Sequence, residues 1–153
     1  VKVLSFGIVS ELFSILKKED QYDIVELYDL DVNVFTNYLS ILSNYRNLCA
    51  HEDILYSNRT QKSIDDTKYH RALNIPIMDN EYIYGKNDLF SVVIIMKSMI
   101  KKDEFDLFVK EIDDLINELD SKLKSIEINK ILDYMGFPIN WKDLGTIEKK
   151  EIF

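Results

Sequence analysis

An arginine and a histidine stand five positions apart in the segment Tyr45-Arg46-Asn47-Leu48-Cys49-Ala50-His51, at the end of a stretch with helical periodicity. On an ideal helical wheel Arg46 falls within an apolar stripe, where a charge is costly unless it has a partner. The stripe consists of Phe35, Leu39, Leu42 and Cys49. Either the guanidinium serves a function, or its aliphatic stem lies along the stripe while its head pairs with a carboxylate.

His51 is expected near the C-terminus of this helix, where the negative end of the helix dipole favours an imidazolium. Such a histidine suits acid–base chemistry near neutral pH. Asn47 lies four residues earlier and is placed to hydrogen-bond the His51 ring, which would fix its tautomer and orientation. The alternative is a histidine that only caps the last helical carbonyls. Five residues along an ideal helix turn it by about 140°, so Arg46 and His51 would point to different faces. We therefore expect the helix to end at or just after His51, or the long Arg46 side chain to bend back.

The remaining residues exclude most other kinds of site. His51 and His70 do not have the spacing of two zinc ligands on one helix, and Cys49 is the only cysteine. The phosphate-binding motifs GxxxxGK[ST] and GxGxxG and the nucleophile motif GxSxG are absent. A magnesium site made of carboxylates alone stays open, because acidic residues are abundant. We expect Cys49 to be a small core residue and His70 to lie in a surface loop.

The elements that must position these residues are predicted to be helices, because apolar residues recur at steps of three and four. The predicted helices cover residues 3–18, 22–28, 32–51, 66–73, 89–100, 105–123 and 128–135. The expected N-caps are Asp29 or Asp31 for the long motif helix and Asn87-Asp88 for the helix that starts at Leu89. Gly136 is expected to end the last helix, and the stretch between Glu52 and Gly85 is predicted to be mostly loop.

Length and composition favour one helical domain over residues 1–153. The chain has only 4 Gly and 2 Pro, too few for the turns of an all-β fold. Its 27 acidic residues outnumber 19 basic ones, and the formal charge of −8 argues against coating nucleic acid or anionic membrane over the whole surface. The single cysteine and the lack of an apolar run near the roughly 20 residues of a membrane span indicate a cytoplasmic protein without a membrane partner. Because a helical pattern begins at Val1 without an initiator Met, we expect an N-terminal truncation.

Three separated segments, in order along the chain, match one family. They are the Phe-Gly stretch Leu4–Leu12, the motif Arg46–His51 with the following residues to Tyr56, and Met135–Trp141. These segments resemble the Phe-Gly helix, the Arg-Asn-x-Cys-Ala-His segment and the Met-Gly-Phe-Pro-x-x-Trp ending of the Abi-like (AbiD/AbiF) abortive-infection proteins, a branch of the HEPN superfamily. The chain departs from the family at Ile54, where relatives often have Arg, and at Ser57, which interrupts the usual Tyr-Asn-Arg run.

The resemblance implies an all-α, HEPN-like helical bundle with a long irregular loop after the Arg-x4-His helix. It also implies a metal-independent endoribonuclease of phage defence that needs no cofactor and works as a homodimer, with two motifs in one cleft. The family's catalytic residues then correspond to Arg46, Asn47 and His51, and its RNA-binding residues to Tyr56, Asn58 and Arg59. The partners it implies are RNA and a second copy, and an antitoxin or phage-encoded trigger stays open.

The chemistry gives a separate reason for two copies. Metal-free RNA cleavage needs one group that accepts the 2′-hydroxyl proton, one that protonates the 5′-oxygen, and a cation near the developing charge. A single copy supplies one His51 and one Arg46, too few for all three tasks, whereas a dimer supplies two of each. In this hypothesis His51 is the general acid or base and Arg46 clamps the phosphate bidentately. Asn47 orients His51 or contacts the ribose, and the products carry 2′,3′-cyclic phosphate and 5′-hydroxyl ends.

Two alternatives belong to other functional classes. A catalytically silent HEPN module would bind RNA, a phage protein or another partner without cleaving it. A helical dimerisation scaffold would present a broad apolar surface and no cleft beside Arg46. Residues 44–71 hold five basic and four acidic residues and form the only segment that is not net acidic, so any RNA is expected to bind there.

Overall fold

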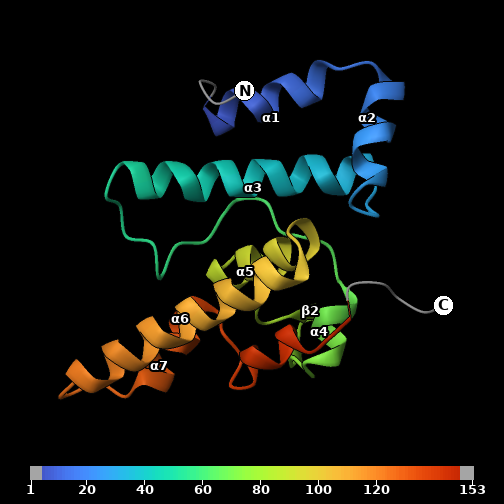
Figure 1. The fold of residues 1–153 in the computed structure, drawn as a ribbon. Coiled ribbons are helices and arrows are strands. Elements are labelled where there is room, and N and C mark those ends of the chain that lie inside the picture. Colours follow the sequence, from blue (N-terminus) through green and yellow to red (C-terminus); the bar gives the residue numbers. More distant parts are fainter. Residues whose placement is uncertain (1–4, 149–153) are drawn as a thin grey trace.

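The computed structural model describes residues 5–148 (Figure 1). Its helices form where the sequence has apolar stripes, and some begin at polar capping residues. The helices are α1 Phe6–Ile15, α2 Lys18–Glu26, α3 Val32–Ala50, α4 Lys68–Ala72, α5 Leu89–Met99, α6 Lys102–Lys122 and α7 Ile128–Met135, and a 3-10 helix, η1, covers Trp141–Gly145. Strands β1 Ile77–Met78 and β2 Glu81–Tyr82 form one antiparallel hairpin. The predicted all-α bundle is confirmed. Within residues 5–148, no helix has the length and apolar content needed to cross a lipid bilayer.

Polar side chains at helix starts explain several boundaries. Ser5 accepts a hydrogen bond from the Ile8 N–H, so α1 begins at Phe6, and the part of the predicted first helix before Ser5 lies outside the described residues. The other end of that prediction was wrong. The backbone turns extended at Leu16, and Lys17 becomes the N-cap of α2, so this lysine starts a helix instead of ending one.

Helix α3 lies between two hydrophobic cores. Above it in Figure 1, α1 and α2 pack against its N-terminal half through Phe13, Val25, Phe35 and Leu39. Below it, a larger core contains Ile41 and Tyr45 of α3 together with the buried residues of α5 and Phe105 of α6. Burial on both sides fixes the long axis of α3, and the Arg46–His51 motif lies at its C-terminal end.

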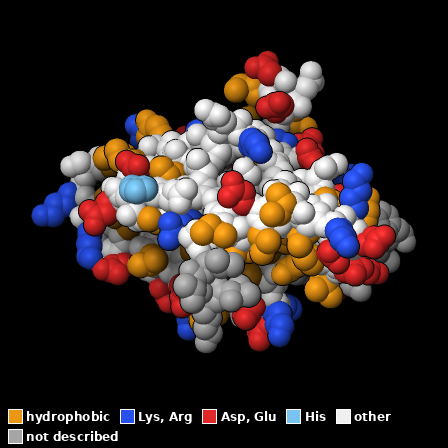
Figure 2. Space-filling view, turned by 90° about the horizontal axis from the view of Figure 1, so that it is seen from above, with side chains coloured by type: hydrophobic (Ala, Val, Ile, Leu, Met, Phe, Trp, Pro, Cys, Tyr) orange, Lys and Arg blue, Asp and Glu red, His pale blue; other side chains and the backbone are white. Residues whose placement is uncertain are grey.

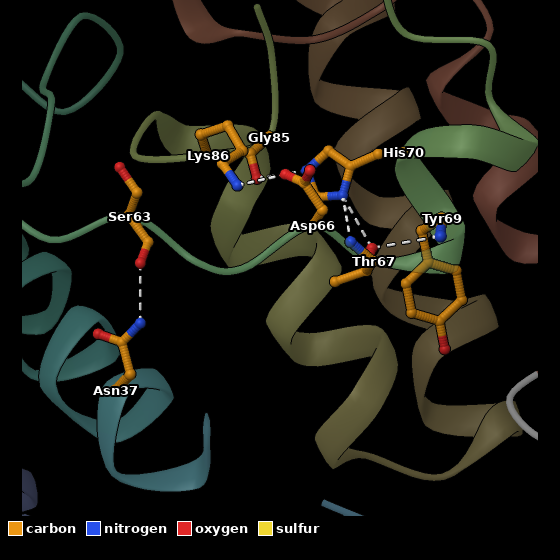
Figure 3. A network of polar contacts seen from close by, with 8 residues as sticks. All are labelled: Asn37, Ser63, Asp66, Thr67, Tyr69, His70, Gly85 and Lys86. Carbon is orange, nitrogen blue, oxygen red and sulfur yellow. Dashed lines mark hydrogen bonds and ion pairs between the residues drawn. The ribbon is translucent and has the colours of Figure 1, made fainter. Parts of the chain in front are cut away.

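The long irregular segment predicted after α3 is present and is tied to the rest of the protein. Figure 1 shows it running back beneath α3, and Figure 3 shows one tether between the two, where the Asn37 amide donates to the Ser63 carbonyl at 2.8 Å. Backbone N–H groups of Thr60 and Ile64 donate to the carbonyls of Asn87 and Lys86, both at 2.8 Å. The segment is therefore irregular but held along its second half.

The β1–β2 hairpin was not predicted from the sequence. Its two turn residues, Asp79 and Asn80, have φ values of 51° and 66°, the left-handed region that a two-residue hairpin turn requires. Asp and Asn tolerate this region better than other residues with a Cβ atom. With strands of only two residues each, the alternation that normally predicts a strand could not show.

The expectation that His70 lies in a surface loop was wrong, because its ring is fully buried. Figure 3 shows the ring between two backbone segments: Nδ1 accepts the Thr67 N–H at 3.0 Å, and Nε2 lies 3.0 Å from the Gly85 carbonyl. Since Nδ1 accepts, Nε2 carries the proton and donates to Gly85. Burial lowers the pKa of His70 from its ordinary value of 6.5, so the ring is neutral and structural.

This burial predicts a pH-dependent stability. Because the folded state holds the pKa of His70 below its unfolded value, the stabilisation is complete above about pH 6.5 and is lost as pH falls through the lower, folded pKa. Replacing His70 with Gln removes the titration. The difference in unfolding free energy between wild type and His70→Gln, measured with urea, should therefore shrink as pH falls below about 6.5. A difference that stays constant over this range would contradict the prediction.

Candidate active site

The motif helix ends where the sequence predicts. Helix α3 stops at Ala50, and His51 is its C-cap, with φ −101° and ψ 7°. Glu52 adopts a left-handed φ of 55°, and the Asp53 N–H donates to the Leu48 carbonyl at 3.1 Å. This is the hydrogen-bond pattern of a Schellman helix end, in which Gly is the usual left-handed residue. His51 therefore does not follow the regular helical spacing of α3, and its side chain is exposed at the C-terminal end of this helix.

Arg46 is exposed, and its guanidinium has a single hydrogen bond, from Nη1 to the Asn47 Oδ1 at 3.3 Å. Among residues 5–148, no carboxylate forms an ion pair with it. The alternative in which Arg46 pairs with a nearby Asp or Glu is thus not seen in the described chain. The guanidinium keeps most of its donors for a ligand.

The predicted hydrogen bond between the Asn47 side chain and the His51 ring is not present among the described residues. Asn47 Oδ1 accepts from Arg46 instead, and within the described residues the His51 ring has no hydrogen-bond partner. The reason is geometric. The expected contact assumed that both residues stay on one helix, whereas His51 has already left the regular helix as its C-cap. The three residues lie at one end of α3. Arg46 and Asn47 are joined by their side chains, and the His51 N–H donates to the Asn47 carbonyl at 3.1 Å.

An apolar groove of about 480 Å³ opens beside Arg46. Its walls come from the C-terminal half of α3, the start of α5, and the facing sides of α6 and α7; they include Leu42, Val92, Ile112, Leu115, Leu119 and Ile131. Arg46 is the only charged residue among the described side chains that line it. Leu115 is 65% exposed and Leu119 39%, so the groove leaves large apolar side chains in solvent.

The groove corrects two expectations about α3. Cys49, predicted to be a packed core residue, is exposed and lines the groove. Arg46 does lie on the apolar stripe, as the helical wheel predicts, but the stripe faces an open groove and the side chain is not buried. Helical periodicity identified the correct face, and the separation between α3 and the α6–α7 pair left part of that face uncovered.

A second hollow, polar in character, lies on the other side of α3. It measures about 580 Å³, and Asn47 and Lys62 line it together with hydroxyl side chains of α1 and α3. The hydroxyl residues are Ser10, Ser14, Thr36, Ser40 and Ser43, with Ser5 at the start of α1. Arg46 and Asn47, adjacent in sequence, thus border an apolar groove and a polar one.

The three residues expected to bind RNA have different surroundings. Tyr56 is half exposed and free to contact a ligand. Arg59, although exposed, donates from Nη1 to the Asn58 carbonyl at 3.1 Å and from Nη2 to the Tyr134 carbonyl at 2.9 Å. Asn58 is half-buried, and within the described chain its Nδ2 is buried without a hydrogen-bond partner. Asn58 and Arg59 therefore make contacts within the protein that the sequence did not indicate.

The charges around the site are mixed. On the face seen in Figure 2, Lys and Arg side chains are scattered among Asp and Glu and form no continuous basic surface. Across residues 5–148, no three His, Cys, Asp or Glu side chains come together in a group that could hold a metal ion. An anionic ligand would therefore depend on individual cations such as Arg46 and Lys62.

Comparison with known proteins finds one family model that matches the part of the chain with the motif. No curated protein and no solved structure matches the chain. Residues 1–57 match the family model described as Abi-like protein, and they include α1, α2, all of α3 and His51. The motif-bearing part of the chain is therefore similar to the Abi-like protein family, as the sequence motifs indicate.

Proposed function

We propose that the protein is a metal-independent endoribonuclease of bacterial phage defence, with an HEPN-type site assembled from two copies of the chain. Similarity to the Abi-like family supports the defence role. The observation that carries the proposed activity is the state of the two motif side chains. Arg46 has no carboxylate partner and His51 has an exposed, unbound ring, both at one end of α3, within the described chain. A purely structural motif would not leave both groups accessible.

In the proposed reaction, one His51 takes the proton from the ribose 2′-hydroxyl while the other protonates the 5′-oxygen that leaves. The 2′-oxygen bonds to phosphorus as the bond to the 5′-oxygen breaks, which yields a 2′,3′-cyclic phosphate and a 5′-hydroxyl. Arg46 donates two hydrogen bonds to the phosphate oxygens and stabilises the added negative charge. Asn47, next to Arg46 and bonded to it, holds the guanidinium or contacts the ribose.

The second copy is proposed to dock on the apolar groove. The reaction needs a second His51 and Arg46, and the groove is the apolar surface that borders Arg46. A two-fold dimer uses the same patch on both copies, so an interface that includes the groove brings the two Arg46 residues toward one another. Covering Leu115 and Leu119 removes apolar area from water and favours association. A cleft beside Arg46 also argues against the plain dimerisation scaffold.

This placement predicts the effect of a charge in the groove. Leu115→Asp should abolish or strongly weaken the dimer, because a carboxylate would be buried against apolar side chains. Leu107→Asp is the matched control, since Leu107 is 57% exposed on the same helix but does not line the groove. Light scattering at micromolar concentration measures the mass of each variant. A monomeric wild type, or equal behaviour of both variants, would contradict this docking surface.

The test of the activity is cleavage of single-stranded RNA in the presence of EDTA, with chemical identification of the product ends. A second candidate function is the catalytically silent module that binds RNA or a partner protein. It is favoured by the His51 ring, which no hydrogen bond orients within the described chain. Binding of RNA without cleavage by the dimer would select this alternative.

A further inference from the structure

Arg59 was expected to contact RNA, but its guanidinium is hydrogen-bonded within the protein. Its guanidinium donates to two backbone carbonyls, one in its own loop at Asn58 and one 75 positions away at Tyr134. Tyr134 is in the last turn of α7, where carbonyls have no partner within the helix and carry the negative end of the dipole. Arg59 thus caps α7 and at the same time attaches the loop that follows His51 to this helix.

The same loop is also attached to the motif helix. The Tyr45 hydroxyl, immediately before Arg46 in sequence, donates to the Asn58 carbonyl at 3.2 Å. Tyr45 is buried, and burial raises its pKa to about 12, so the hydroxyl remains a donor at working pH. The Asn58 carbonyl therefore receives one bond from α3 and one from Arg59, and the other terminal nitrogen of Arg59 extends this junction to α7 at the Tyr134 carbonyl.

This junction is the first firm attachment after the motif. Residues 54–57, between the end of α3 and the junction at Asn58, are exposed or half-buried. Among the described residues, the backbone hydrogen bond that involves this stretch runs from the Asn58 N–H to the Leu55 carbonyl. After the junction, Thr60 is held by the Asn87 carbonyl. The position of the chain from His51 to Ser57 is thus set by α3 at one end and by Asn58 and Arg59 at the other.

We infer that Arg59 is a positioning residue, which fixes the segment after His51 between α3 and the end of α7 and so holds the His51 ring at the site. This inference rests on the proposed function for its effect on cleavage, but its effect on the loop does not depend on that function. It also joins the loop that follows the second family-like segment to the helix that leads into the third, because Tyr134 immediately precedes Met135-Gly136-Phe137-Pro138. The C-terminal segment would then support the active site without touching RNA.

The experiment compares Arg59→Gln with Arg71→Gln. Both variants remove one exposed arginine charge, but Arg71 makes no side-chain hydrogen bond in the described chain. Arg59→Gln is expected to lower kcat about tenfold and to speed hydrogen exchange of the Asp53 and Asn58 amides, whose N–H groups are hydrogen-bonded, by a similar factor. The dependence of RNA affinity on salt should stay that of wild type, because no phosphate contact is lost. Arg71→Gln should leave kcat and loop exchange unchanged.

Other outcomes overturn the inference. If Arg59→Gln weakens RNA binding and reduces the salt slope by about 0.7 while loop exchange is unchanged, Arg59 is a phosphate contact. If wild type cleaves no RNA, the proposed function fails, and the exchange measurement still decides on the clamp: unchanged exchange refutes it. Should Arg59→Gln not fold, Arg59→Lys serves, since lysine keeps the charge but not the planar fork. Faster exchange of the Asp53 and Asn58 amides is then expected, and exchange at the wild-type rate would refute the clamp.

Discussion

Replacing His51 with alanine is expected to slow RNA cleavage about a thousandfold, because it removes the proton acceptor and donor from both copies of the site. The variant should fold as wild type does, since the ring is exposed and makes no hydrogen bond within the described chain. Arg46→Gln should lower kcat by a factor of about a hundred or more, through loss of phosphate charge stabilisation. Lysine at this position should rescue only part of the rate, because it cannot bind the phosphate bidentately.

The measurement is single-turnover cleavage of a labelled RNA in EDTA, together with thermal unfolding of each variant. Ser57→Ala serves as the control, as Ser57 is an exposed residue of the same loop whose hydroxyl has no hydrogen bond among the described residues. Full cleavage by His51→Ala would refute the mechanism. Loss of wild-type cleavage in EDTA would do the same, because the proposed reaction requires no metal ion.

Local sequence signals predicted most of the helices correctly. Asp88 caps α5 by accepting the Ser91 N–H at 3.0 Å, and Gly136 ends α7 with φ 78°, both as expected. The same signals located the end of α3 at His51. Each of these features depends on residues within one turn of each other, which is why the sequence alone could indicate them. Whether Arg46 and Cys49 are buried or exposed depends instead on whether helices distant in the sequence cover this face of α3. Hydrophobic periodicity within one helix holds no information about that.

The polar contacts of the candidate site were the least predictable part. Arg59 and Tyr134 are far apart in sequence, and their contact uses a backbone carbonyl, which has no residue-type signal. His70 is a similar case, because its partners are a backbone N–H and a backbone carbonyl that only the fold brings together. Nothing in the residue types distinguishes this buried histidine from the exposed His51. The family comparison does separate them, since His51 lies within the matched residues 1–57 and His70 lies outside them.

The third family-like segment has a physical explanation in the packing around Gly136. Its backbone adopts φ 78°, and a Cβ atom there would lie 2.1 Å from Cγ and 2.2 Å from Oδ2 of Asp88. Asp88 is itself buried and accepts hydrogen bonds from the N–H groups of Gly85 and Ser91. Burial raises the pKa of Asp88 to about 6, so near pH 7.5 the carboxyl is charged and depends on these donors. The glycine therefore leaves the space that the α5 cap occupies.

Gly136→Ala should accordingly be among the most destabilising single changes in the protein, at about 3 to 6 kcal/mol. The estimate combines roughly 1 kcal/mol for a left-handed alanine, a few kcal/mol for forcing a side chain into a filled space, and about 1 kcal/mol for a disturbed cap. Since domains of this kind are stable by about 5 to 15 kcal/mol, the variant should be close to unfolding. Urea denaturation at about pH 7.5 measures the loss.

Gly145→Ala is the matched control, because a Cβ atom at Gly145 meets nothing within 4 Å and the residue has no positive φ. It should change the unfolding free energy by less than about 1 kcal/mol. Asp88→Ala then tests the two shortest contacts, since it removes the Cγ and Oδ2 atoms that the new Cβ would meet and keeps the Cβ of residue 88, which would lie 2.6 Å away. Gly136→Ala should cost less in that background, and the difference measures the contact. Equal costs in both backgrounds would show that the Cγ and Oδ2 of Asp88 are not the reason that position 136 requires glycine.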